Sequence, residues 1–191
     1  KTPTPAYLGA ARAAIATVAP IKTQPVMPTP QNVTTPQNTT TPQKKPLKAV
    51  TLHRPWPYAI AHLGKDIENR PWPCPLEPGE TLAIHAGTKF DDTAADWIRS
   101  EIGVDLPPDG SDHPIGIVAI ATFAGNLQAS DSPWYMGKVA WQLTNVIVLP
   151  KVVPMGGNQR LWTVPKQFLP ELRSLYQLGE PAKNDHKLRT A

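Results

Sequence analysis

The chain contains a single cysteine, Cys74, among its 191 residues. One cysteine excludes an intramolecular disulfide and a zinc site built from cysteines. Because Cys74 lies between Pro73 and Pro75, we predict an irregular loop in which the thiol fills space and is not an activated nucleophile. An unpaired thiol fits a reducing compartment, so we expect a cytoplasmic location.

Long apolar runs and clustered metal ligands are also missing. No stretch approaches the roughly 18 apolar residues that a membrane-spanning helix needs, so we expect no membrane partner. The five histidines show no His-x-x-x-His or similar spacing. We therefore predict neither a metal site nor a cofactor.

Acidic residues are absent from residues 1–46, which are dense in Pro, Thr, Gln and Asn. Such a segment cannot bury enough apolar surface to offset its chain entropy, so we predict a disordered tail that is available to a protein partner. The tail holds five of the 19 basic residues, which leaves 14 against all 15 acidic residues in the rest of the chain. The remainder is therefore about neutral, which argues against a broad phosphate-binding face.

Short apolar runs separated by turn signals follow the tail. Because no helix is expected between residues 115 and 149, a doubly wound parallel sheet is excluded and the class is α+β, with a small mixed β-barrel. We expect this domain to cover residues 47–180, followed by a polar C-terminal tail at residues 181–191. The predicted strands are 48–52, 66–69, 81–86, 115–123 and 139–149, and the predicted helices are 57–63, 91–102 and 165–178.

The segment GKDIENR, residues 64–70, follows the first predicted helix and carries an unusual set of charges. Gly64 is placed to adopt the left-handed conformation that ends helices. In an extended segment, Glu68 and Arg70 lie on one face while Ile67 points to the core. Lys65, Glu68 and Arg70 then form either a ligand site or a solvated ion-pair cluster of little energetic value.

Several pieces of the chain, in order, resemble an ASCH domain, a family with the pattern Gly-x-Lys-x-x-Glu-x-Arg after a helix that starts near Pro-Trp. The pieces are residues 52–56 with 64–70, residues 82–87, and residues 132–134 with 139–143. The resemblance covers residues 47–177. It implies a PUA-like β-barrel and an association with RNA and modified nucleosides.

The resemblance leaves catalysis open. Some ASCH proteins resemble small amidohydrolases acting on acylated cytidine, with a Lys-x-x-Thr-x-Arg version of the motif, and others look like ribonucleases. Here Glu68 occupies the Thr position. A carboxylate cannot replace the hydroxyl directly, but Lys65 and Glu68 could still activate water or a ribose hydroxyl by acid–base chemistry.

Tryptophans beside prolines supply candidate stacking partners for a base. Trp56, Trp72 and Trp134 each adjoin a proline, and an exposed loop aromatic near basic residues is what a base-stacking pocket requires. We expect Trp97 and Trp141 to be core residues instead.

His85 lies near the end of the predicted strand 81–86, directly before Ala86 and Gly87. A lone strand histidine is more often structural, but the Gly turn permits close approach of a ligand, so His85 joins the candidate ligand-binding residues. The candidate ligand-binding set is Lys65, Glu68, Arg70, Trp56, His85 and Trp134.

Three functional hypotheses remain. The first is a domain that binds RNA or a modified nucleoside through Lys65, Glu68 and Arg70. The second is a ribonuclease or amidohydrolase that uses Lys65 and Glu68 as catalytic residues. The third is an adaptor module in which the charges form only an ion-pair network and the tail carries the function.

Overall fold

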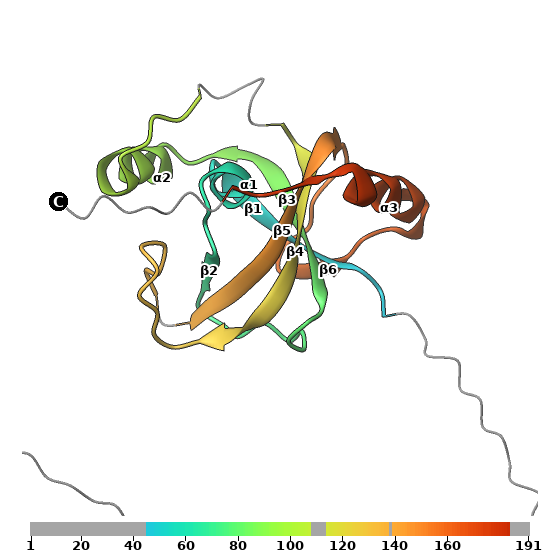
Figure 1. The fold of residues 1–191 in the computed structure, drawn as a ribbon, viewed down its shortest axis with the longest axis horizontal. Helices are drawn as coiled ribbons and strands as arrows, with labels where there is room; N and C mark the ends of the chain where they lie inside the picture. The colour runs from blue at the N-terminus through green and yellow to red at the C-terminus, as the bar shows by residue number, and fades with distance from the viewer. Residues whose placement is uncertain (1–44, 108–113, 138, 184–191) are drawn as a thin grey trace, which may run out of the picture. The chain divides into compact units, whose positions relative to one another are not determined.

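Seven strands form one mixed sheet in the computed structural model, which describes residues 45–107, 114–137 and 139–183 (Figure 1). The strand order is β2-β5-β4-β3-β1-β6, and β7 pairs with β5 beside this path. The β1–β3 pairing is parallel, and the other pairings are antiparallel. The strands are β1 (Lys48–Arg54), β2 (Ile67–Arg70), β3 (Thr81–Phe90), β4 (Gly116–Leu127), β5 (Val139–Val153), β6 (Leu161–Thr163) and β7 (Glu180–Pro181).

Three α-helices accompany the sheet in the described ranges. The first, α1 (Trp56–His62), directly follows β1; the second, α2 (Asp92–Trp97), continues as a π-helical segment, η1 (Ile98–Ile102). A short 3-10 segment, η2 (Lys166–Phe168), leads into α3 (Leu169–Leu178). Figure 1 shows α2 and α3 on opposite sides of the sheet. The α+β class is therefore confirmed.

The helix ends form where the sequence predicts them. Gly64 adopts a left-handed φ of 67° just after α1, which lets the chain turn sharply into β2. The Asp91 side chain accepts a hydrogen bond from the Ala94 amide (3.1 Å) at the start of α2. Gly103, with a φ of 73°, follows η1.

Four of the five predicted strands are longer than predicted, β2 is shifted by one residue, and two strands were not predicted at all. β4 and β5 reach 12 and 15 residues because they pair along most of their length. The strands β6 and β7 are three and two residues long, too short for alternation of apolar and polar residues to reveal them.

The sheet does not close on itself within the described residues, and β2 and β6 are its two ends. Only the first half of β1, Lys48 to Val50, pairs with β6. At the next residue, the Thr51 carbonyl accepts a long hydrogen bond (3.4 Å) from Arg70 of β2. The Arg70 side chain thus reaches from β2, one end strand of the sheet, to the second half of β1.

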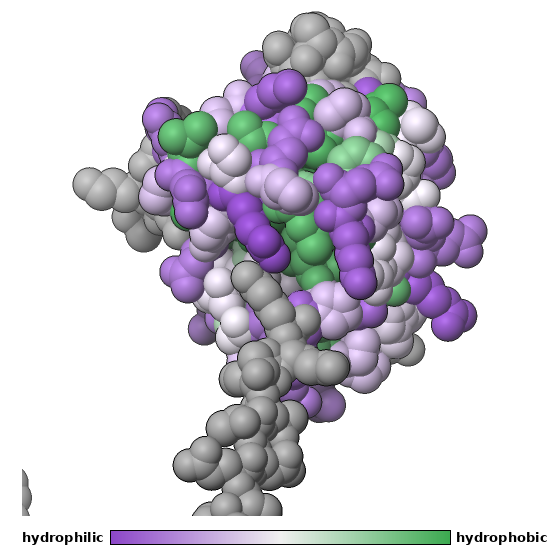
Figure 2. Space-filling view, turned by 90° about the vertical axis from the view of Figure 1, so that its right-hand side faces the viewer, coloured by the Kyte–Doolittle hydropathy of each residue, from purple (hydrophilic) through white to green (hydrophobic). Residues whose placement is uncertain are grey.

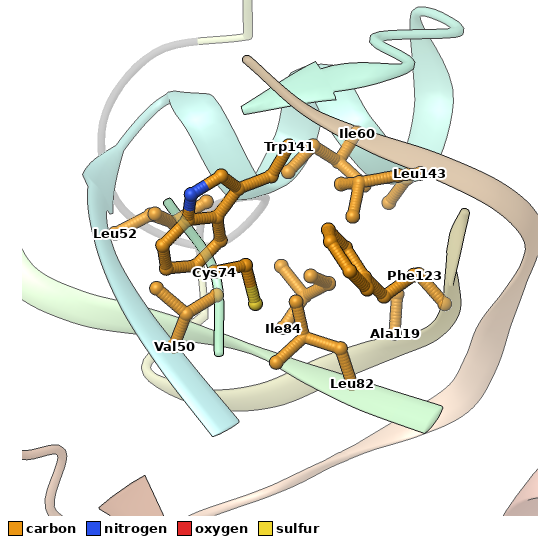
Figure 3. Close-up of a cluster of buried hydrophobic side chains, with 12 residues drawn as sticks. Val50, Leu52, Ile60, Cys74, Leu82, Ile84, Ala119, Phe123, Trp141 and Leu143 are labelled. Atoms are coloured by element: carbon orange, nitrogen blue, oxygen red, sulfur yellow. The ribbon is translucent and has the colours of Figure 1, made fainter. Parts of the chain in front are cut away.

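The main core lies inside the curve of the sheet. Trp141 is fully buried, as predicted, and its ring packs near Val50, Leu52 and Cys74 (Figure 3). Trp97 is only partly buried, against the separate cluster that includes Trp134 and Ile67.

The surface is mixed. On the face shown in Figure 2, apolar residues form a central patch between hydrophilic ones. Apolar surface of this kind is normal for a folded domain. No helix in the described part of the chain is both long enough and apolar enough to cross a membrane.

The tail predictions fall mostly outside the described residues. The structure describes only the last two residues of the predicted N-terminal tail and the first three of the predicted C-terminal tail. Two of those three still contact the sheet, since Pro181 pairs with Ile147 and the Ala182 amide donates to the Val146 carbonyl.

Candidate functional site

Lys65, Glu68 and Arg70 are brought together at the start of β2. Glu68 lies between the two cations: its Oε2 is 3.1 Å from Lys65 Nζ, and its Oε1 is 2.9 Å from Arg70 Nε. Lys65 Nζ also donates to the Ile67 carbonyl. The prediction that Glu68 and Arg70 share one face of an extended segment is confirmed, and Ile67 is fully buried as expected. We call Lys65, Glu68 and Arg70 the charged triad.

Burial distinguishes the charged triad from a surface ion-pair cluster. The side chains of Lys65 and Glu68 are only 2% and 9% exposed, whereas that of Arg70 is 22% exposed. The hypothesis of a solvated cluster is therefore wrong. Two of the three charges are held inside the protein, where a charge must be paired and hydrogen-bonded to be tolerated.

The charged triad has an excess of positive charge. It contains two cations and one carboxylate. The adjacent carboxylate of Asp66 is engaged elsewhere, since its Oδ1 accepts a hydrogen bond from Ser132 Oγ (2.5 Å). An unbalanced positive charge in a partly buried place favours binding of an anion or a hydrogen-bond acceptor.

Tryptophan rings surround both cations. Lys65 Nζ lies over the Trp56 ring, 5.4 Å from its centroid. The Arg70 guanidinium carbon lies 5.7 Å from the Trp72 ring centroid and 5.9 Å from that of Trp141. These cation–π contacts are favourable, and only that of Lys65 lies where water is largely excluded.

Arg70 and Trp72 together form the exposed part of this site, which we call the Arg70–Trp72 rim. Arg70 Nη1 has no hydrogen-bond partner among the described residues, and Nη2 has only the long bond to the Thr51 carbonyl. Trp72 is 37% exposed, and its carbonyl accepts a hydrogen bond from the buried Trp141 indole N–H (2.9 Å). The rim therefore presents hydrogen-bond donors beside an aromatic ring whose backbone is anchored to the core.

The other two candidate stacking residues are placed differently. Trp134 is fully buried, so the expectation of an exposed aromatic at this position is wrong. The physical reason is its loop: Asn69 donates to the Trp134 carbonyl (2.8 Å) and accepts from the Met136 amide (2.9 Å), which ties the loop to β2. Trp56 is partly buried between Lys65 and Trp97.

His85 is also buried, with 1% of its surface exposed. Its Nε2 lies 3.0 Å from the Met155 carbonyl, and its ring meets Trp162 edge-on. Burial lowers the pKa of His85, so the ring is neutral at pH 7 and Nε2 donates to Met155. The burial and these contacts favour the structural role that a lone strand histidine usually has, and a role of His85 in ligand binding stays a prediction.

Cys74 agrees with its prediction. The residue is buried, and burial raises the pKa of its thiol above the ordinary value. The Asn126 side chain binds both the amide and the carbonyl of Cys74, which fixes the loop. A protonated, buried thiol is a poor nucleophile.

Two pockets lie apart from the charged triad. Two adjoining pockets, of about 120 and 430 Å³, share residues of α1 and β5, among them Ala61 and Val148. Neither pocket is lined by Lys65, Glu68 or Arg70. Within the described ranges, no three His, Cys, Asp or Glu side chains group as metal ligands.

The structure adds two contributors that sequence reasoning did not include in the site. They are the Thr51 carbonyl and the Trp141 ring, both in contact with Arg70. A backbone acceptor has no sequence signature. The place of Trp141 follows from its register opposite Glu68, which only the folded sheet reveals.

Comparison of the chain with models of known protein families and with curated proteins finds no match. The resemblance to ASCH domains therefore stays a prediction that rests on the motif and on the order of the matching pieces.

Proposed function

We propose that this domain is an ASCH-type member of the PUA-like superfamily and that it binds RNA or a modified nucleoside at the Arg70–Trp72 rim. The observation that carries the proposal is that most hydrogen-bond donors of Arg70 have no partner in the part of the chain that the structure describes. Its buried Nε forms an ion pair with Glu68 but no hydrogen bond, its Nη2 has one long bond, and its Nη1 has no partner among the described residues. A charged group with unused donors beside an exposed indole suits a ligand that has both acceptors and an aromatic face.

The fold supports the same proposal. A helix follows β1 directly, and the curved mixed sheet is open between β2 and the second half of β1, which β6 does not pair with. Both features are compatible with a PUA-like barrel whose seam forms the ligand site. Arg70 spans this seam through its contact with the Thr51 carbonyl. A ligand acceptor could replace that long bond at little cost, since N–H···O bonds are normally 2.7–3.2 Å long.

Binding is favoured over hydrolysis by the burial of the acid–base candidates. A general acid or base must come within hydrogen-bond reach of the substrate. The Lys65 ammonium is 2% exposed and is already bonded to Glu68 and the Ile67 carbonyl. In this arrangement Lys65 and Glu68 position Arg70 and do not contact the ligand.

The experiment is a titration of the full chain with a mixed-sequence single-stranded RNA of ten nucleotides and with N4-acetylcytidine. Arg70→Ala removes the charge-assisted bonds, each worth about 1.5–3 kcal/mol, so we expect an affinity at least about tenfold weaker. Arg173→Ala, which removes an exposed arginine of α3, is the matched control for lost charge and should bind like the native chain.

Equal affinity of the native chain and Arg70→Ala would contradict the proposal. If no ligand binds at all, the adaptor hypothesis becomes the better one. If either ligand is turned over, and Lys65→Met abolishes that turnover, the hydrolase hypothesis replaces simple binding.

A further inference from the structure

We infer that the Arg70–Trp72 rim selects nucleobases that present two adjacent hydrogen-bond acceptors on one edge: guanine through O6 and N7, and cytosine through O2 and N3. This inference rests on the proposed function and specifies which part of the nucleic acid Arg70 reads. It follows from the way the protein restrains the guanidinium.

Burial of Nε beside Glu68 leaves one edge of the guanidinium for a ligand. Arginine has five N–H donors in one plane. Its Nε is buried with Glu68 Oε1 at 2.9 Å, as an ion pair without a hydrogen bond, so a ligand cannot reach the edge that carries Nε. The edge formed by Nη1 and Nη2 remains, and it offers two parallel donors and no acceptor. A ligand that satisfies this edge must supply two acceptors side by side.

The aromatic neighbours favour a base over a phosphate at this edge. The guanidinium carbon lies within 6 Å of the Trp72 and Trp141 ring centroids. A planar base bonded to the guanidinium can also contact the exposed part of the Trp72 ring, whereas a tetrahedral phosphate has no aromatic face to stack. The near-neutral charge after residue 46 supplies no broad attraction for phosphates either.

The four bases differ in the pattern of their edges. Guanine offers O6 and N7 together, and cytosine offers O2 and N3 together. Adenine places its N6 amino donor beside N7 and N1, and uracil places N3–H between O2 and O4. The Nη1–Nη2 edge of Arg70 has donors only. An edge of adenine or uracil would therefore place one of its own N–H donors against an N–H donor of Arg70.

The test uses the full chain and four seven-nucleotide RNAs that differ only in the central base, set in a uridine background. We expect the RNAs with central guanine or cytosine to bind about tenfold or more tightly than those with adenine or uracil. Replacing the central guanine by 7-deazaguanine removes N7 and should cancel its advantage. This RNA tests whether guanine is read through its O6/N7 edge.

Arg70→Lys keeps the charge but not the two-donor fork, so it should bind all four RNAs alike, whereas Arg173→Ala should keep the preference. If all four RNAs bind the native chain equally and Arg70→Ala still weakens them, RNA binding stands but the inference is overturned, because Arg70 then contacts the backbone. Preference for adenine or uracil also overturns it. Absence of binding to every RNA overturns the proposed function and the inference with it.

Discussion

Glu68 is the residue on which the charged triad depends. It is the carboxylate that pairs with both Lys65 and Arg70, and its side chain is 9% exposed. Removing it leaves two cations close together with no counter-charge, whereas removing Lys65 leaves a neutral Glu68–Arg70 pair. The two substitutions should therefore lower the free energy of unfolding by different amounts, although both break the Lys65–Glu68 ion pair.

We expect Glu68→Gln to lower the free energy of unfolding by about 3–5 kcal/mol, the range for leaving a buried charge unpaired. Lys65→Met should cost about 1–3 kcal/mol, mainly because the Ile67 carbonyl loses its donor. Urea denaturation of both variants measures the difference. A loss for Lys65→Met equal to or greater than that for Glu68→Gln would contradict this description of the triad.

His85 makes stability depend on pH. Burial lowers the pKa of His85 from its ordinary value of about 6.5, so below pH 6.5 the unfolded chain takes up a proton that the folded protein excludes. The free energy of unfolding should thus fall as the pH drops from 6.5 toward the lower folded pKa. Above pH 7 this contribution to stability is fully present.

Urea denaturation at pH 7.5 and at pH 5 tests this effect. His85→Gln retains a side-chain donor for the Met155 carbonyl but does not titrate, so it should lose less stability between the two pH values than the native chain. The other four histidines are present in both proteins and cancel in the comparison. The same loss in both proteins would show that His85 does not control the acid response.

At the scale of elements, the segment between β5 and β6 fits tightly against the sheet at one glycine. A Cβ added to Gly157 would lie 2.5 Å from Thr51 Oγ1 and 2.7 Å from His85 Nδ1. Its neighbour Gly156 has no atom within 4 Å of such a Cβ. Thr51 also supplies its carbonyl to Arg70, so this contact lies beside the proposed site.

We expect Gly157→Ala to destabilise the fold by about 1–3 kcal/mol, the range for forcing an extra methyl group into a packed place. Gly156→Ala should leave the free energy of unfolding nearly unchanged. Thermal denaturation of the two variants side by side measures the contrast. Equal melting temperatures would mean that the segment shifts to make room.

The elements could largely be predicted from sequence, because their signals are local. Gly64, Asp91 and Gly103 mark helix ends through backbone conformation and capping, and the apolar run of β4 marks a strand. The exposure of side chains could not be predicted in the same way. Trp134 and Trp72 both adjoin prolines, yet the side chain of Asn69 binds the loop of Trp134 and helps place Trp134 in the core. Contacts between residues 65 positions apart leave no trace in local sequence.

At the scale of the whole molecule, charge and topology point to a local binding site. The chain after residue 46 has 14 basic and 15 acidic residues, so no general excess of positive charge attracts a polyanion. The local excess is in the charged triad, beside the opening of the sheet between β2 and the second half of β1. Recognition should therefore depend on a few charge-assisted bonds and on stacking.

The most direct measurement is an NMR titration that follows the six tryptophan indole N–H signals of the full chain as a short single-stranded RNA is added. The Trp72 signal, assigned by its loss in Trp72→Phe, should shift most, while the signal of the fully buried Trp134 should stay nearly constant. The same titration of Arg70→Ala should move the Trp72 signal far less at equal RNA concentration. RNA binding that saturates without shifting Trp72, or that shifts it equally in Arg70→Ala, would contradict the assignment of the site to the Arg70–Trp72 rim.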